Sequence, residues 1–238
     1  MFGDLSNLLP LSITMSETQR RDFLKTAGTA LSAAGVGVLS LSSLAAQDGA
    51  AKKRKIIGIN GSHRAGKTCA QALGVVFEAI KAADPSLETE LVELASVKVG
   101  FALDTSEPDG IDALFKQMTD PSCAGVVVAS PIYCGLPSAR LTSLINRLSS
   151  LRQTWALKNK IVGLVAVAGA RNGGQETILQ AMMNSFVAQQ MILAVDGVPT
   201  SHWGATLWNQ RDSIMEDEYG IGTAKNLGTR IAELAKLV

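Results

Sequence analysis

Apolar residues along this chain gather into short runs separated by segments with helical spacing. Runs rich in β-branched residues predict buried strands, whereas apolar positions three and four apart predict helices. The segment 68–83, for example, places Ala72, Val76 and Ile80 on one helical face and stops before Pro85. The expected strands are 55–60, 88–94, 125–130, 160–168 and 191–195, and the expected helices are 68–83, 111–119, 138–151, 176–190 and 222–237.

Strands without strict alternation, interleaved with helices, predict an α/β fold whose parallel sheet is covered on both faces. We therefore expect one doubly wound, five-stranded parallel sheet with helices on both faces, and we find no internal repeat. Such sheets bind ligands beyond the carboxyl ends of the strands, where the winding reverses. The candidate loops are those that follow Asn60, Ser130 and Ala168.

The first fifty residues follow a different pattern. Arg20 and Arg21 precede nineteen uncharged residues, 26–44, and a stretch of small residues ends at Ala46. A basic region, an apolar region and a small-residue cleavage site define a secretory signal, and the paired arginines resemble the twin-arginine type. We expect residues 1–46 to be this signal, 47–54 a leader and 55–238 the folded domain. The expected location is periplasmic or otherwise extracytoplasmic, with membrane contact only during export. The alternatives are an uncleaved anchor and an amphipathic start of the fold.

Composition and charge narrow the function classes. Hydrophobic residues make up 47% of the chain and charged residues 18%, which excludes a disordered protein. The net charge of +1 gives no reason to expect nucleic acid as a partner. The three cysteines, Cys69, Cys123 and Cys134, form no C-x-x-C pair, so we expect neither a metal site nor a disulfide framework.

The loop after the first strand predicts a phosphate site. Residues 61–68, Gly-Ser-His-Arg-Ala-Gly-Lys-Thr, match the Walker A pattern G-x-x-x-x-G-K-[ST]. Backbone N–H groups at a helix N-terminus, with hydroxyls and cations beside them, bind any phosphate. Ser62, Arg64, Lys67 and Thr68 are the candidate donors. The strand 125–130 ends in Ser130 instead of an acid that would help hold magnesium, which argues against a triphosphatase.

Two further loops carry a resemblance to a known family. Residues 131–135, Pro-Ile-Tyr-Cys-Gly, resemble the flavin-ring loop of the flavodoxin-like NADPH-dependent FMN reductases. Residues 169–176 resemble the glycine-rich third loop of that family, and 61–68 resemble its phosphate loop. The resemblance implies a flavodoxin-like fold, FMN as cofactor, NAD(P)H as possible electron donor, a small-molecule acceptor and a homo-oligomer.

The resemblance also implies where FMN lies. The cofactor carries the chemistry in such enzymes, so no protein group is assigned as acid or base. The implied FMN-binding residues are Ser62, Arg64, Lys67, Thr68, Pro131, Ile132, Tyr133, Cys134, Gly135, Gly169, Gly173 and Gly174.

Several positions depart from the family pattern. Lys67 replaces a common Asn, His63 a common Pro and Cys134 an aromatic residue. The related iron–sulfur flavoproteins carry a cysteine cluster after the second strand, where residues 95–101 of this chain contain none, so no cluster is expected. We expect His202 to lie in a surface loop and residues 212–218 to form a solvated acidic stretch.

These observations predict an exported FMN oxidoreductase that passes electrons from NAD(P)H or another donor to a quinone, a flavin or another small acceptor. Two alternatives remain open. One is a flavodoxin-like electron carrier without turnover of its own, and the other is a P-loop nucleotide-binding protein that uses residues 61–68.

Overall fold

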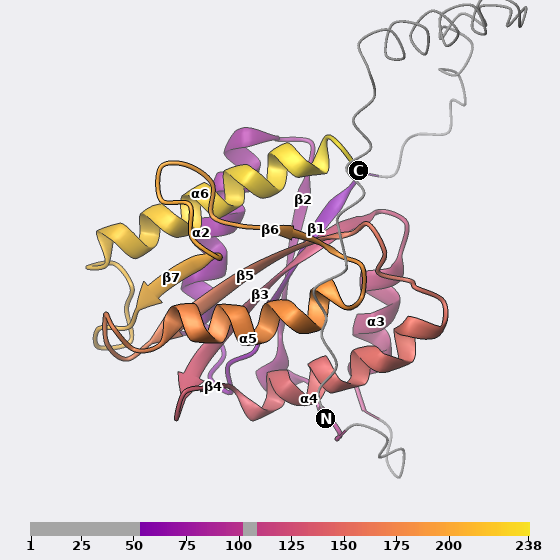
Figure 1. Cartoon of the computed structure of the whole chain (residues 1–238), viewed down its shortest axis with the longest axis horizontal. Coiled ribbons are helices and arrows are strands. Elements are labelled where there is room, and N and C mark those ends of the chain that lie inside the picture. Colours follow the sequence, from indigo (N-terminus) through magenta and orange to yellow (C-terminus); the bar gives the residue numbers. More distant parts are fainter. Residues whose placement is uncertain (1–52, 102–108) are drawn as a thin grey trace, which may run out of the picture. The chain divides into compact units, whose positions relative to one another are not determined.

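The computed structural model describes residues 53–101 and 109–238 (Figure 1). The predicted export signal, and most of the leader after it, lie outside the described residues. The elements in chain order are β1 (Lys55–Asn60), α2 (Thr68–Ala83), β2 (Glu88–Glu93), the 3₁₀ helix η2 (Leu94–Ser96), α3 (Ile111–Thr119), β3 (Cys123–Tyr133), β4 (Leu136–Pro137), α4 (Ala139–Arg147), the 3₁₀ helix η3 (Leu148–Gln153), β5 (Ile161–Ala168), α5 (Gln175–Val187), β6 (Ile192–Ala194), β7 (Ala205–Trp208) and α6 (Glu218–Ala235).

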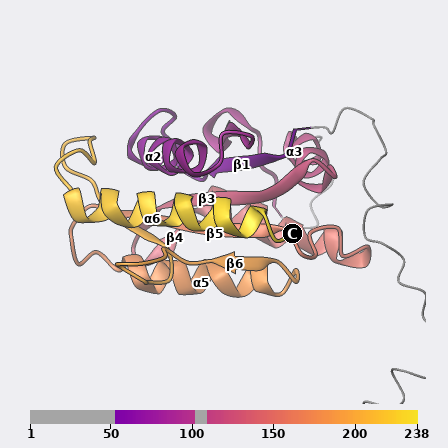
Figure 2. The ribbon, with the colours of Figure 1, turned by 90° about the horizontal axis from the view of Figure 1, so that it is seen from above.

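The strands form one sheet with the order β2-β1-β3-β5-β6, and neighbours along this path are parallel. Figure 2 shows β1, β3, β5 and β6 following one another across the sheet. This is the flavodoxin-type order, in which the winding reverses between the first strand and the third. The predicted flavodoxin-like fold is confirmed.

The fifth position of the sheet is divided between two short strands. β6 pairs with residues Ile161 to Gly163 of β5, and β7 pairs with Val165 to Ala168 further along the same strand. The sequence predicted a single strand over 191–195 and missed β7. A four-residue apolar run is too short for periodicity to identify.

The third strand is longer than the predicted 125–130. β3 continues past the sheet and folds back as a hairpin with β4, in which Ile132 pairs with Pro137 and Tyr133 with Leu136. The two turn residues, Cys134 and Gly135, have φ values of 50° and 74°. Two central residues with positive φ are typical of the tight type I′ hairpin turn.

The helix boundaries follow from local capping. Ser138 begins α4 by accepting a hydrogen bond from the Leu141 N–H, and Asp217 begins α6 by accepting one from the Gly220 N–H. The prediction placed the start of the last helix at residue 222, because Gly220 and Gly222 obscure its first turn. The predicted helix 138–151 ends as α-helix at Arg147 and continues as η3.

Two apolar layers hold the sheet between its helices. α2 and α6 cover one face of the sheet, where they pack on Ile56, Val127 and Val165 of the strands. α3, α4 and α5 cover the other face, over Ile57, Val128 and Leu164. Successive residues of a strand point to opposite faces, so both sides of these central strands are buried. Among the described helices, none has the length and apolarity to cross a membrane.

Candidate functional site

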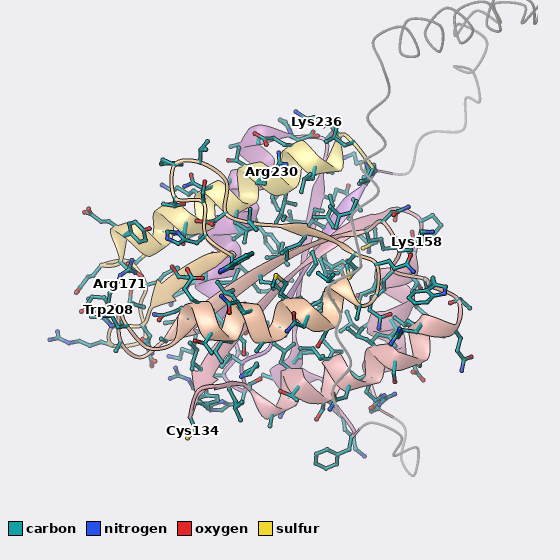
Figure 3. All side chains as sticks on the ribbon, in the orientation of Figure 1. Cys134, Lys158, Arg171, Trp208, Arg230 and Lys236 are labelled. Carbon is teal, nitrogen blue, oxygen red and sulfur yellow. The ribbon has the colours of Figure 1, made fainter. Side chains whose placement is uncertain are left out.

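The predicted site residues gather at the carboxyl end of the sheet. Figure 3 shows Cys134, Arg171 and Trp208 toward one end of the molecule. Cys134 follows β3, Arg171 follows β5, and Trp208 is the last residue of β7. Lys158, which precedes β5, and Lys236, which follows α6, lie toward the other end. The winding reverses between β1 and β3 on this edge, which is where doubly wound sheets bind ligands.

The phosphate loop between β1 and α2 is shaped by short-range hydrogen bonds. The Ser62 N–H donates to Asn60 Oδ1 at 2.9 Å, and the Arg64 N–H donates to Ser62 Oγ at 3.0 Å. The Gly66 N–H donates to Glu93 Oε1 at 3.0 Å, and Glu93 also accepts from Asn60 Nδ2 at 2.5 Å. The loop is therefore tied to the ends of both β1 and β2.

The N-terminus of α2 is open to a ligand. Lys67 stands at the cap position, where no side chain accepts from the first backbone N–H groups, and the first turn holds no acid. Ser62 and Thr68 place hydroxyl groups at this end and are almost fully buried. Free N–H groups and the positive end of the helix dipole favour an anion at this position.

The two cations of this loop meet a carboxylate from a distant segment. Arg64 Nη1 lies 2.6 Å from Asp212 Oδ1, and Lys67 Nζ lies 3.4 Å from Asp212 Oδ2. The hydrogen bond from Arg64 is the main cause of a lowered pKa for Asp212, and the charges of Arg64 and Lys67 add to it. Arg64 and Lys67, which were predicted to bind the same group, are thus found together on one anion.

The expectation that residues 212–218 form a solvated acidic stretch holds only in part, since Glu216 and Glu218 are exposed but Asp212 and Asp217 are paired. Asp212 pairs with the phosphate loop, and Asp217 is 4% exposed. Asp217 accepts from the N–H groups of Trp208 and Gly220 and pairs with Arg171 Nη1 at 2.9 Å. Asp212 thus serves as an ion-pair partner, and Asp217 serves as both an ion-pair partner and a helix cap.

The second predicted loop is the β3–β4 hairpin. Pro131 and Ile132 are half-buried, whereas Tyr133, Cys134 and Gly135 are exposed at its tip. The Tyr133 hydroxyl lies 3.0 Å from His63 Nδ1, which joins this hairpin to the phosphate loop. Partial burial raises the pKa of Tyr133.

The third predicted loop follows β5. Gly169 has open space around its Cα, and Gly174 adopts the left-handed φ of +88° immediately before α5. A Cβ at Gly173 would lie 2.4 Å from Ala168 Cβ, so the tight turn requires glycine there. Gln175 fixes the loop, since its side chain accepts from the Gly173 N–H and donates to the carbonyls of Ala170 and Leu207.

A fourth segment, 209–217, joins the third loop to the first and was missed by the sequence analysis. The Asn209 N–H donates to the Ala168 carbonyl at 2.8 Å, and Asn209 Oδ1 accepts from the Asp212 N–H at 2.9 Å. Gln71 of α2 exchanges hydrogen bonds with the Asp212 carbonyl and the Ile214 N–H. These contacts hold the Asp212 carboxylate over the phosphate loop.

A hollow of about 340 Å³ adjoins the third loop, and His202 lies on its edge. His202 is half-exposed, as expected, and its Nδ1 lies 3.5 Å from the Tyr219 hydroxyl and 3.7 Å from Asp196 Oδ2. Asp196 is fully buried and accepts from Thr200 Oγ1 at 2.5 Å and from the His202 N–H. Its carboxylate thereby organises the loop between β6 and β7.

The cysteines lie on separate parts of the fold. Cys69 is buried in α2 and Cys123 in β3, while Cys134 is exposed on the hairpin turn. In the part of the chain that the structure describes, no group of three or more His, Cys, Asp or Glu side chains is placed to hold a metal ion. The whole sequence holds three cysteines, one fewer than the four thiolates of a common [4Fe–4S] site.

Comparison with known proteins agrees with this geometry. The family model described as NADPH-dependent FMN reductase matches residues 54–204, which include all three predicted loops. This chain belongs to the NADPH-dependent FMN reductase family. It is 37% identical over 196 residues to an iron–sulfur flavoprotein of Methanocaldococcus jannaschii, covering 77% of this chain and 98% of that protein. An iron–sulfur flavoprotein of Methanosarcina thermophila is 31% identical over 194 residues, covering 77% and 96% of the two chains.

Solved structures support the flavodoxin-like fold. The structure of RosB with a bound riboflavin-phosphate intermediate matches with a TM-score of 0.61 at 14% identity, covering 77% of this chain and 79% of that one. A flavodoxin-type, WrbA-like protein of Agrobacterium tumefaciens matches with a TM-score of 0.56 at 13% identity, covering 78% and 99%. The family assignment makes the chain a flavoprotein-type oxidoreductase, while its cysteine content does not fit an iron–sulfur cluster of the four-thiolate kind.

Proposed function

We propose that this chain binds FMN at the carboxyl end of its sheet and acts as an oxidoreductase that passes electrons from NAD(P)H, or another donor, to a small acceptor. The observation that carries this proposal is the meeting of the three predicted loops on one edge of the sheet, within a family match that spans them. FMN, when bound, supplies the electron-transfer chemistry, and the protein supplies position and environment.

The phosphate loop offers a donor set that suits the single phosphate of FMN. The uncapped α2 N-terminus and the hydroxyls of Ser62 and Thr68 provide donors, and Arg64 and Lys67 provide positive charge. The Asp212 carboxylate already occupies these two cations, which supports the proposal that they bind oxyanions.

The hairpin and the third loop suit a flat ring with a polar edge. Tyr133 and Leu136 expose apolar surface on the hairpin, at 44% and 64% of their possible area. An aromatic side chain favours stacked or edge contacts with a ring system. A Cβ at Gly174 would meet no atom within 4 Å, so this part of the third loop leaves room for a ring to approach the backbone.

The proposal includes export by the twin-arginine route to a periplasmic or extracytoplasmic location. Its basis is the sequence pattern of residues 1–46. Free NAD(P)H is not expected there, so a membrane quinol or a redox partner is a possible physiological donor. The twin-arginine route carries folded proteins, which suits a cofactor loaded before export. We also propose that the chain forms a homo-oligomer. Its partners are a small-molecule electron donor and acceptor, and it does not bind nucleic acid.

An absorbance spectrum of the purified protein, before and after addition of FMN, tests the proposal. We expect flavin absorbance bands at about 370 and 450 nm that the protein retains through gel filtration. A protein that stays colourless with FMN but binds ATP and magnesium would contradict it and favour the P-loop alternative. Steady-state assays with NADH, NADPH and quinones then separate an enzyme from a carrier, since a carrier shows no turnover.

A further inference from the structure

The phosphate loop matches the Walker A pattern at every position, yet the chain belongs to a family named for FMN. We propose that two carboxylates, Asp212 and Glu93, restrict this loop to a single phosphate group and exclude polyphosphates such as those of nucleoside triphosphates. This inference rests on the proposed binding of FMN and adds what selects the ligand. Neither acid belongs to the motif, and each reaches the loop from another element.

Asp212 forms an ion pair with Lys67, the lysine of the Walker A motif. In a nucleotide-binding P-loop this lysine reaches the β- and γ-phosphates. Here Lys67 Nζ lies 3.4 Å from Asp212 Oδ2, and Arg64 lies 2.6 Å from the other carboxylate oxygen. The backbone of Asp212 is fixed by hydrogen bonds to the side chains of Asn209 and Gln71. Ile214, in the same segment, is buried in the core. Lys67 is thus directed toward a protein carboxylate.

Glu93 accepts a hydrogen bond from a backbone N–H group of the same motif. The N–H groups of the P-loop cradle the phosphates of a nucleotide. In this chain the Gly66 N–H, which belongs to the second glycine of the motif, donates to Glu93 Oε1 at 3.0 Å. The other oxygen of Glu93 accepts from Asn60 Nδ2, so the carboxylate is fixed at the end of β2.

The remaining donors suffice for one phosphate. The N-terminus of α2, Ser62 and Thr68 still face the loop, and Arg64, which Asp212 contacts through Nη1, has further N–H donors. A second or third phosphate would lack the Gly66 N–H and full use of Lys67, and its charge would be repelled by Asp212 and Glu93. The same loop geometry therefore binds a monoester and penalises a polyphosphate.

Competition experiments on the apoprotein test this inference. FMN binding is followed by fluorescence, and inorganic phosphate and tripolyphosphate are used as competitors. In the wild type we expect tripolyphosphate to inhibit at least about threefold more weakly than inorganic phosphate. In Asp212→Asn we expect tripolyphosphate to become at least about tenfold stronger relative to phosphate. Glu216→Gln is the matched control, because it removes one negative charge from an exposed position in the same segment.

The outcomes separate this inference from the proposed function. A wild-type apoprotein that does not bind FMN would overturn both. FMN binding with an unchanged ratio in Asp212→Asn, or an equal change in Glu216→Gln, would overturn the selectivity inference alone. If Asp212→Asn lowers the unfolding temperature, the ratio is measured on Glu93→Ala, which removes the charge and leaves the Gly66 N–H without this acceptor. An unchanged ratio there has the same negative meaning.

Discussion

The hydroxyl of Ser138 donates to the carbonyl of Gly61 at 2.5 Å, across 77 positions of the sequence. The same hydroxyl caps α4 by accepting from the Leu141 N–H at 3.2 Å, and the Ser138 N–H donates to Ser130 Oγ. One buried serine thus joins the start of the phosphate loop to the base of the hairpin loop. We infer that the relative position of these two loops depends on it.

Replacement of Ser138 by Ala should lower the free energy of unfolding by about 1–2 kcal/mol, because a cap and a buried hydrogen bond are lost together. It should also weaken FMN binding, since the two loops are no longer joined. Chemical denaturation and FMN titration measure the two effects. The exposed Ser149 lies on η3, and Ser149→Ala should change stability by less than about 0.5 kcal/mol. Equal effects of the two substitutions would argue against the joining role.

Arg64→Gln should weaken FMN binding roughly 10- to 100-fold and leave riboflavin binding nearly unchanged, because only FMN carries the phosphate. The estimate follows from the loss of a charge-assisted hydrogen bond of about 1.5–3 kcal/mol. Paired titrations of the apoprotein with FMN and riboflavin provide the measurement. Arg230→Gln serves as control, since Arg230 lies on α6 (Figure 3) and pairs with Glu233. A parallel loss of riboflavin affinity would show that Arg64 acts on the ring or on folding.

Two glycines of the third loop separate backbone conformation from packing. A Cβ on either Gly169 or Gly174 meets no atom within 4 Å, but only Gly174 has a positive φ, of +88°. Gly174→Ala should destabilise the apoprotein by about 1–2 kcal/mol, the cost of a left-handed conformation with a side chain. Gly169→Ala should be nearly neutral. Urea denaturation of both variants checks this, and equal stabilities would show that the loop relaxes without cost.

Thiol labelling should distinguish the three cysteines. Burial raises the pKa of Cys69 to about 12 and also raises the pKa of Cys123, while Cys134 is exposed. Since the thiolate is the reactive form, an aromatic disulfide reagent at about pH 8 should modify one thiol in the native protein and three after unfolding. Cys134→Ser should abolish native labelling. If FMN covers the hairpin, labelling of Cys134 should slow when FMN is bound; fast native labelling of two thiols would contradict the buried positions.

Asp109 should make stability depend on acid pH. Burial opposes its ionisation, but the N–H groups of Gly100 and Ile111 and the guanidinium of Arg147 outweigh this and lower its pKa. A lowered folded-state pKa means that the stabilisation is present above the unfolded pKa of about 3.9 and is lost as pH falls through the folded value.

Asp109→Asn should therefore reduce stability near pH 7 and show a smaller loss between about pH 5 and 2 than the wild type. Denaturation series across this range measure the slope. Asp112 is the matched control, because it lies 3.7 Å from the same Arg147 but its side chain is 81% exposed. A slope that changes equally in Asp112→Asn would assign the effect to general charge.

Local periodicity alone determined much of this protein. α2 and α3 were predicted at their observed bounds, and β1 as well, because each buries a regular apolar face or run between clear breaks. Parallel strands followed from the unalternated runs, and parallel strands bring their carboxyl ends to one edge. The positions of the loops after β1, β3 and β5 on that edge could therefore be inferred before any coordinates, whereas the flavodoxin-like fold was implied by the family resemblance.

Tertiary structure decided what completes the site. β7 has four residues and is recognisable only through its pairing with β5. Arg64 and Asp212 are 148 positions apart in the sequence. They meet because Asn209, Gln71 and Ile214 hold the segment around Asp212 against α2 and the core. A charged residue in a polar stretch has the same local pattern whether it is solvated or paired, since periodicity records burial within an element and not the partner that a fold brings to it.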